Sequence, residues 1–154
     1  MKYVLITGSS GLVGSEAVNF FIKKKFKIIT VDNNLRKYFF GKNADTNWQK
    51  KNQIKKFKNE IIHNSVDIRN YRKMTDIFFK YKKKIRCIIH AAAQPSHDWA
   101  YKEPILDFDV NAKATLHLLE CTKKFCPKAT FIYVSTNKVY GDTPNKLKIK
   151  EKKT

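Results

Sequence analysis

Three glycines near the amino end of the chain, Gly8, Gly11 and Gly14, recur at intervals of three residues. They follow a short apolar run at residues 3–7 and precede apolar residues with helical spacing, the context that a phosphate-binding turn requires. Glycine lets the backbone approach a pyrophosphate closely, and the N-terminus of the following helix stabilises its negative charge. The sequence therefore predicts a dinucleotide-binding loop. Its expected contact residues are Gly8, Ser10, Gly11, Leu12, Val13 and Gly14.

Asp32 directly follows a second apolar run, at residues 27–31. A carboxylate at the end of the second strand can accept hydrogen bonds from both hydroxyls of the adenosine ribose. The same charge repels a 2′-phosphate, so the pattern favours NAD over NADP. The alternative is a turn residue in Asp-Asn-Asn, but the glycine loop before it favours the ribose role.

Five strands are needed to position these groups. Apolar runs predict them at residues 3–7, 27–31, 60–66, 86–90 and 130–134. Helical spacing between the first two runs places Val13, Ala17 and Phe20 or Phe21 on one face. A second helical stripe joins Leu106, Val110, Ala114, Leu118 and Cys121.

Strands that alternate with helices imply right-handed crossovers and a parallel sheet covered on both faces. We therefore expect an α/β fold, a doubly wound parallel sheet of the NAD-binding Rossmann type that stops after about the fifth strand. Residues 1–145 would form this domain and residues 146–154 a frayed, Lys-rich tail. The pattern leaves the structure of residues 33–59 open, with a helix at the end of that insert as one option.

The formal charge of +19 comes mostly from lysine, since only four of the 32 basic residues are Arg. Proteins that grip phosphates or bases favour Arg, so we interpret the lysines as compositional bias and expect no specific nucleic-acid partner. The three cysteines lack zinc-ligand spacing, and we expect idle thiols and no metal site. No signal peptide or membrane-length apolar stretch is visible, which predicts a cytoplasmic protein.

The chain resembles the extended short-chain dehydrogenase/reductase family of nucleotide-sugar epimerases and dehydratases. The resemblance rests on residues 7–14, 67–68, 90–93 and 135–141, which occur in that family's order. Four further stretches are similar to the CDP-paratose 2-epimerase group of the family: residues 31–36, 38–41 with 45–48, 92–99 and 135–142. The resemblance covers the whole chain but only the front half of a family member.

The resemblance implies a role for each matching residue. Asp67 and Ile68 would flank the adenine, and small side chains after the fourth strand would leave room for the coenzyme. Asn111 would support the site, and Ser96 and His97 would lie near the nicotinamide or the sugar substrate. His97 has an ordinary loop role as its alternative, and His63, His90 and His117 are expected to be structural. The complete implied coenzyme set beyond the glycine loop is Asp32, Asn33, Arg36, Asp67, Ile68, Ala91, Ala92, Ala93, Gln94, Asn111 and Ser135.

The resemblance also implies the chemistry. Thr136 would be the catalytic Ser/Thr, and a Tyr with a Lys four residues later would take the sugar hydroxyl proton as hydride passes to NAD. Tyr140 cannot be that Tyr, because Pro144 stands four residues later. The one formal match, Tyr38 with Lys42, lies in the insert and is interpreted as coincidence. We therefore expect a fragment that lacks the carboxyl-terminal substrate domain and is not catalytic alone.

Three alternatives stay open. The family could be right and the reaction another, such as a 4-epimerase, a dehydratase or a reductase. The chain could be a non-catalytic coenzyme-binding or assembly module that works with a separately encoded carboxyl half. A basic nucleic-acid binder is the third, and would show salt-sensitive affinity independent of NAD. Relatives often dimerise through helices of this region, so a homodimer is also an option.

Overall fold

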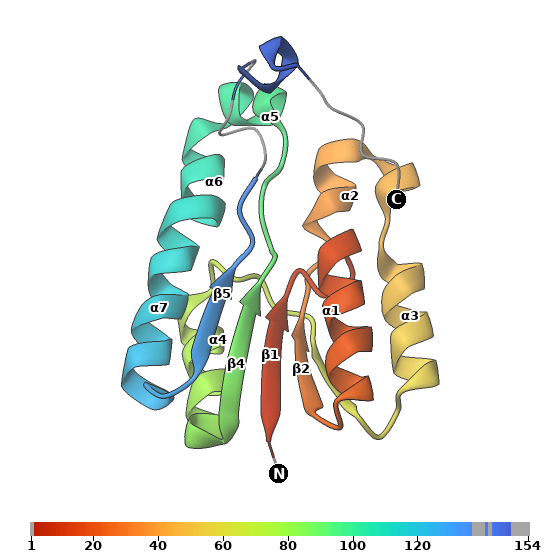
Figure 1. Ribbon diagram of the computed structural model, residues 1–154, viewed down its shortest axis with the longest axis vertical. Helices are drawn as coiled ribbons and strands as arrows, with labels where there is room; N and C mark the ends of the chain where they lie inside the picture. The colour runs from red at the N-terminus through yellow and green to blue at the C-terminus, as the bar shows by residue number, and fades with distance from the viewer. Residues whose placement is uncertain (1, 137–140, 142, 149–154) are drawn as a thin grey trace.

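Five parallel strands form one sheet in the order β3-β2-β1-β4-β5 in the computed structural model, which describes residues 2–136, 141 and 143–148 (Figure 1). The strands are β1 (Tyr3–Thr7), β2 (Lys27–Val31), β3 (Ile61–Asn64), β4 (Ile85–His90) and β5 (Thr130–Tyr133). Each apolar run predicted as a strand is a strand, and the expected parallel α/β sheet is confirmed. Only β3 is clearly shorter than expected, because Ser65 and Val66 have already left the sheet.

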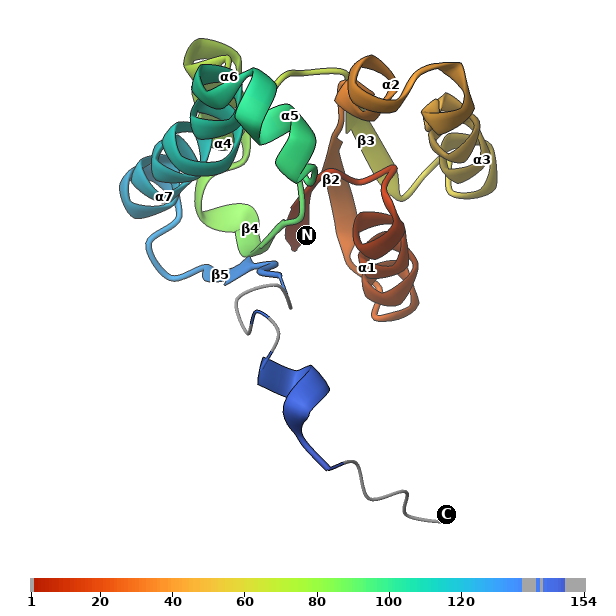
Figure 2. The same cartoon turned by 90° about the horizontal axis from the view of Figure 1, so that it is seen from above.

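Helices lie on both sides of the sheet, but β5 stays largely exposed, with Ile132 44% and Tyr133 51% exposed. Viewed from above, α1 and α3 lie on one side, and α4 and α7 lie on the other (Figure 2). The α-helices are α1 (Leu12–Lys23), α2 (Leu35–Phe40), α3 (Asn47–Lys56), α4 (Tyr71–Tyr81), α5 (His97–Lys102), α6 (Pro104–Phe108) and α7 (Ala114–Phe125). Short turns of other helix types are η1 (Lys42–Ala44), η2 (Lys82–Lys84), the π-helical η3 (Asp109–Lys113) and η5 (Thr143–Lys146).

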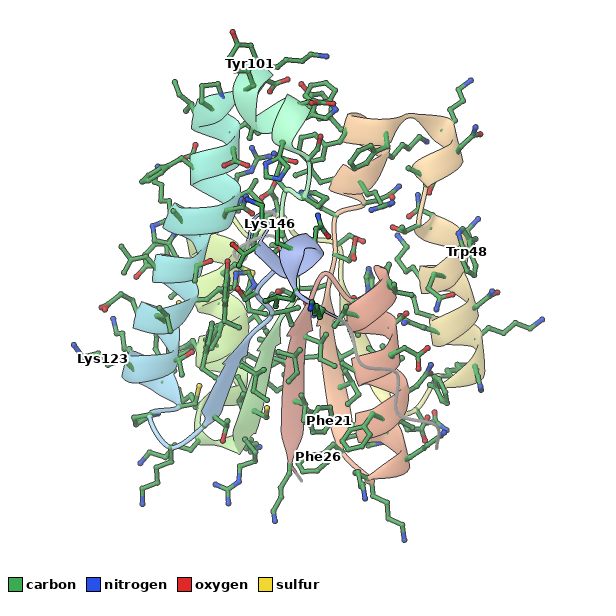
Figure 3. All side chains as sticks on the ribbon, turned by 45° about the horizontal axis from the view of Figure 1, so that its top comes forward. Phe21, Phe26, Trp48, Tyr101, Lys123 and Lys146 are labelled. Carbon is green, nitrogen blue, oxygen red and sulfur yellow. The ribbon has the colours of Figure 1, made fainter. Side chains whose placement is uncertain are left out.

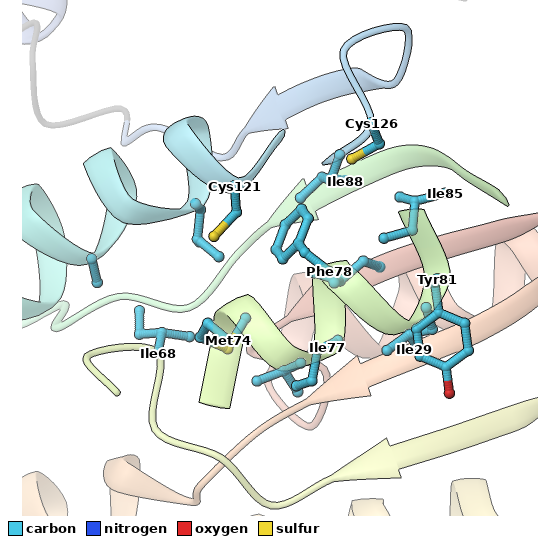
Figure 4. Packing of buried hydrophobic residues seen from close by; sticks show 14 of the residues in the cluster. Ile29, Ile68, Met74, Ile77, Phe78, Tyr81, Ile85, Ile88, Cys121 and Cys126 are labelled. Carbon is cyan, nitrogen blue, oxygen red and sulfur yellow. The ribbon is translucent and has the colours of Figure 1, made fainter. Parts of the chain in front are cut away.

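Alternate residues of the strands feed two apolar layers. Leu5 and Ile88 face the layer under α4 and α7, where Phe78 and Met74 are fully buried (Figure 4). Val4 and Ile6 face the layer under α1, together with Val18. Because both faces of β1 and β2 are covered, these strands read as continuous apolar runs, which is why they could be located from the sequence.

The expected buried face of α1 is confirmed in part. Ala17 and Phe21 pack beside the fully buried Val18, whereas Val13 is 50% exposed and Phe20 is 54% exposed. The helix begins at Leu12, so Val13 belongs to its first turn and faces the pocket described below. The second predicted stripe is confirmed for Val110, Ala114, Leu118 and Cys121, which are buried, whereas Leu106 is only half-buried.

The insert at residues 33–59 folds into α2, η1 and α3, and so ends in a helix. Asn34 organises it from the left-handed region, at φ 58° and ψ 33°. Its side-chain nitrogen donates to Asp45 (2.9 Å), and its side-chain oxygen accepts from the backbone N–H of Thr46 (2.9 Å). The Gln53 side chain then joins α3 to the glycine loop by donating to the carbonyl of Ser9 (3.0 Å).

His90 is a buried structural residue at the end of β4. Its Nδ1 lies 2.7 Å from the Thr7 hydroxyl and its Nε2 lies 2.9 Å from the Thr115 hydroxyl. The Thr115 hydroxyl donates to the carbonyl of Asn111 (2.8 Å), so it must accept from Nε2–H, and Nδ1 then accepts from Thr7. This network suits a neutral ring, and burial lowers the pKa of His90 to about 4 from its ordinary 6.5.

We expect the free energy of unfolding to fall by about 2 kcal/mol between about pH 7.5 and about pH 5 because of His90. The lowered pKa means that the unfolded chain binds the proton first as the pH drops, so the stability is present above about pH 6.5 and is lost toward about pH 4. Urea unfolding at the two pH values measures the difference. His90→Gln should flatten most of it, and an equally steep dependence in that variant would contradict this account.

The described residues hold no disulfide. Cys121 and Cys126 are buried, and burial raises the pKa of the Cys126 thiol to about 11. Among the described residues, no group of His, Cys, Asp and Glu is arranged to hold a metal ion, and no helix is long and apolar enough to cross a bilayer.

Candidate functional site

The glycine loop connects β1 to α1, and two of its glycines have no room for a Cβ atom. Gly8 has φ 65°, and a Cβ atom there would lie 2.7 Å from the backbone nitrogen of Ala92. A Cβ on Gly14 would lie 2.1 Å from the carbonyl oxygen of Gly8. Glycine at these positions lets β1, α1 and the segment after β4 approach each other at backbone distance, as a dinucleotide-binding turn requires.

A pocket of about 240 Å³ lies where the carboxyl ends of β1, β2 and β4 meet the first turn of α1. No acidic residue lies in that first turn, and no side chain caps the helix N-terminus at Gly11. Its amide groups are therefore suited to an anion. The lining residues are Gly8, Gly11, Leu12, Val13, Gly14, Val31, Asp32, Asn33, Leu35, Arg36, Thr46, Val66, Asp67, Ile68, Ala91, Ala92, Ala93, Pro95, Val110 and Val134.

Asp32 joins the glycine loop to the end of β2. One of its oxygens accepts from the backbone N–H of Ser10 (2.9 Å) and the other accepts from the backbone N–H of Asn34 (2.8 Å). A carboxylate has about four lone-pair sites, so acceptor capacity remains for a ligand. Asp32 thus fixes the loop and still faces the pocket.

Asp67 also lines the pocket and is held by Arg69. The guanidinium contacts both carboxylate oxygens, at 2.6 Å from Nη2 to Oδ2 and 3.0 Å from Nε to Oδ1, and the Asn33 side chain donates to Oδ2 (3.0 Å). Burial raises the pKa of Asp67, but the hydrogen bonds from Arg69 outweigh it and hold that pKa below its ordinary value. Arg69 was not predicted, although a basic residue two positions after Asp67 was a readable signal.

The segment after β4 presents three small side chains to the pocket, those of Ala91, Ala92 and Ala93. Gln94 turns away from it and is 5% exposed. Its amide donates to Asp107 (2.7 Å), and Asn111 holds its backbone by accepting from the N–H (2.9 Å) and donating to the carbonyl (3.0 Å). Gln94 and Asn111 therefore hold the segment that lines the pocket without lining it themselves.

The other predicted site residues lie outside the pocket lining. Ser96 caps α5, with its hydroxyl accepting from the backbone N–H of Trp99 (3.4 Å), and His97 is exposed at the start of that helix. Ser135 and Thr136 are exposed and follow Val134, which does line the pocket. Ser10 is joined to the lining residue Asp32 by its backbone N–H. Residues 137–140, which include Tyr140, and residues 149–154 of the tail lie outside the described residues. The roles expected for Ser96, His97, Ser135 and Thr136 stay predictions.

Tyr38 is not arranged as a catalytic base. Its hydroxyl donates to a carboxylate oxygen of Glu103 (2.8 Å), and that hydrogen bond raises the pKa of Tyr38. A Tyr base needs a lowered pKa, so this geometry supports the interpretation of Tyr38 and Lys42 as a coincidental pair.

Several residues that line the pocket were not among the predicted site residues. Val31, Val66 and Val134 were expected only as strand or near-strand residues, and Leu35 and Thr46 fell in the insert whose structure was open. Their shared signal is position, since each lies at or just beyond the carboxyl end of a strand or in the insert that folds over it.

The strand order, the glycine loop and the acidic residue after β2 together define a dinucleotide-binding domain. A model of the GDP-mannose 4,6 dehydratase family matches residues 5–154. The chain therefore belongs to the extended short-chain dehydrogenase/reductase family of NAD-dependent nucleotide-sugar epimerases and dehydratases.

Individual relatives agree with this assignment. CDP-paratose 2-epimerase of Salmonella typhi is 34% identical over 139 residues, which span 90% of this chain and 38% of the relative. UDP-glucose 4-epimerase of Thermotoga maritima, solved with UDP-glucose, is 26% identical with a TM-score of 0.70, over 96% of this chain and 41% of that one. UDP-glucose 4-epimerase of Thermus thermophilus, solved with NAD, is 25% identical with a TM-score of 0.61, over 80% of this chain and 34% of that one. The chain thus corresponds to the amino-terminal part of these proteins and spans less than half of their length.

Proposed function

We propose that this chain is the NAD-binding amino-terminal part of a cytoplasmic, NAD-dependent nucleotide-sugar epimerase resembling CDP-paratose 2-epimerase. The observation that carries the proposal is the pocket at the carboxyl ends of the strands. It brings together the glycine loop, Asp32 and the small side chains of Ala91 to Ala93, which come from three separate parts of the sequence. The Thermus thermophilus relative supports NAD as the ligand, and the Salmonella typhi relative supports the 2-epimerase group.

The pocket fits the adenosine end of a dinucleotide. Apolar Val66 and Ile68 offer a surface for a base, Asp32 offers acceptors for ribose hydroxyls, and the first turn of α1 offers amides for the pyrophosphate. Pockets that enclose small ligands hold roughly 300–1,000 Å³. At about 240 Å³ this one encloses only part of a dinucleotide, and the nicotinamide end would extend toward Val134 and the residues that follow it.

The chemistry of the family requires more than this chain carries. The resemblance implies a Tyr with a Lys four residues later, and the only such pair in the sequence is Tyr38 with Lys42, in the insert. NAD supplies the hydride acceptor when bound, Thr136 would steady the reacting oxygen, and the carboxyl-terminal part of the family fold would supply the remaining groups and the nucleotide-sugar site. A non-catalytic coenzyme-binding or assembly module is the second candidate, favoured by the same missing pair.

We expect the purified chain to bind NAD at least about tenfold more tightly than NADP, because Asp32 would repel a 2′-phosphate. Parallel titrations followed by thermal shift measure the ratio. Equal affinity for the two coenzymes would contradict the ribose role of Asp32.

With NAD and CDP-paratose present, the chain alone should form no CDP-tyvelose. Measurable epimerisation would overturn the claim that other residues are needed.

A further inference from the structure

Two stretches of the chain meet beside the coenzyme pocket. They are residues 38–41, in α2 and at its end, and residues 92–99, which run from the pocket into α5. Leu35 and Arg36, at the start of α2, line one side of the pocket, and Ala93 and Pro95, just before α5, line the other. Viewed from above, α2 and α5 lie next to each other beyond the carboxyl ends of the strands (Figure 2).

Aromatic rings join the two helices. The ring of Trp99 lies 5.5 Å from that of Tyr38 and 5.5 Å from that of Phe39, centroid to centroid, at interplanar angles of 44° and 62°. Both distances are within the range of favourable aromatic pairs. The Tyr38 hydroxyl adds a hydrogen bond to Glu103, the residue that follows α5 (2.8 Å).

The contact is anchored on both sides. Phe39 is only 5% exposed, so its ring is fixed in the fold and offers Trp99 a rigid surface. The chain before α5 is held by Gln94, whose side chain accepts from the N–H of Ser96 (2.5 Å) and donates to its carbonyl (2.9 Å). The three rings join α2 and α5 next to the lining residues Leu35, Arg36 and Pro95, so moving the two helices apart requires separating Trp99 from its ring partners.

We propose that Tyr38, Phe39 and Trp99 form an aromatic clasp that closes the coenzyme pocket and sets the rate at which the coenzyme leaves. This inference rests on the proposed function. An epimerisation has no net oxidation, because the hydride removed from the sugar is returned to the same sugar. A coenzyme that left between the two transfers would leave an oxidised sugar behind, so slow exchange serves this reaction in particular.

The test is the dissociation rate of NADH from the full chain, measured by stopped-flow fluorescence after mixing with excess NAD. Trp99→Ala should raise the dissociation rate constant roughly tenfold or more, because two ring contacts are lost. Tyr101→Ala is the matched control, since Tyr101 lies on the same helix, is 89% exposed and points away from the molecule (Figure 3). It should leave the rate unchanged. Tyr38→Phe, which keeps the ring and removes the hydrogen bond to Glu103, should give a smaller increase.

The outcomes separate the clasp from the proposed function. If wild type binds NADH and Trp99→Ala releases it at the wild-type rate, the clasp is wrong and the coenzyme assignment stands. If wild type binds no NADH, both are wrong. Should Trp99→Ala fail to fold by circular dichroism, Tyr38→Ala replaces it, because that side chain is 56% exposed and is not part of the core. An unchanged rate in that variant also overturns the clasp.

Discussion

Replacing Asp32 with Ala is expected to weaken NAD binding by about 100-fold or more. A hydrogen bond to a charged group contributes roughly 1.5–3 kcal/mol, and the carboxylate would make two of them to the ribose. The substitution also removes the acceptor of the Ser10 and Asn34 backbone N–H groups, so the glycine loop loses its tie to β2. The dissociation constant from a fluorescence titration is the measurement.

Two further variants serve as controls for Asp32→Ala. Asp32→Asn keeps one acceptor oxygen and should fall between wild type and Asp32→Ala. Asp76→Ala removes the same charge from an exposed position on α4, on the opposite face of the sheet from α1, and should bind NAD like wild type. Unchanged affinity in Asp32→Ala would show that this carboxylate is only a turn residue.

Replacing Gly14 with Ala is expected to destabilise the fold by about 3 kcal/mol or more. In an exposed helix the same change would stabilise by roughly 1 kcal/mol, so the expected sign is opposite to helix propensity. The reason is space: the added Cβ would lie 2.1 Å from the carbonyl oxygen of Gly8 and 2.9 Å from the Cα of Ser9, both backbone atoms. The first turns of α1 would have to move away from β1, which also distorts the phosphate site.

Urea unfolding of Gly14→Ala beside Gly11→Ala measures this effect. A Cβ on Gly11 would meet only the Gly8 carbonyl oxygen, at 3.3 Å, and its φ of −77° suits any residue. Gly11→Ala should therefore cost far less. A Gly14→Ala variant as stable as wild type would contradict the close packing of the loop against α1.

The centre of the sheet could be predicted because β1 and β2 are buried on both faces. Residues 27–31 form β2 with the bounds expected from their apolar run, and Asp32 follows where a ribose ligand belongs. The insert could not be predicted in the same way. Its path depends on Asn34, whose left-handed backbone and side-chain bonds to Asp45 and Thr46 leave no periodic trace in the sequence.

The direction in which a side chain points was the other feature that the sequence could not predict. Val13 matched a buried helical stripe by spacing, but its place in the first turn of α1 directs it to the pocket. Gln94 lies among pocket residues in sequence, yet Asp107 accepts a hydrogen bond from its side-chain amide and Asn111 holds its backbone, so the side chain is buried away from the pocket. Contacts between segments far apart in the chain decide such orientations, and the pairing of Trp99 with Tyr38 and Phe39 is of the same kind.

A calorimetric titration of the purified chain with NAD tests the central claim most directly. The account predicts saturable binding of about one NAD per chain, lost on Asp32→Ala, in a protein whose circular dichroism shows the α/β fold. A folded chain that gives no saturable binding of NAD would contradict it.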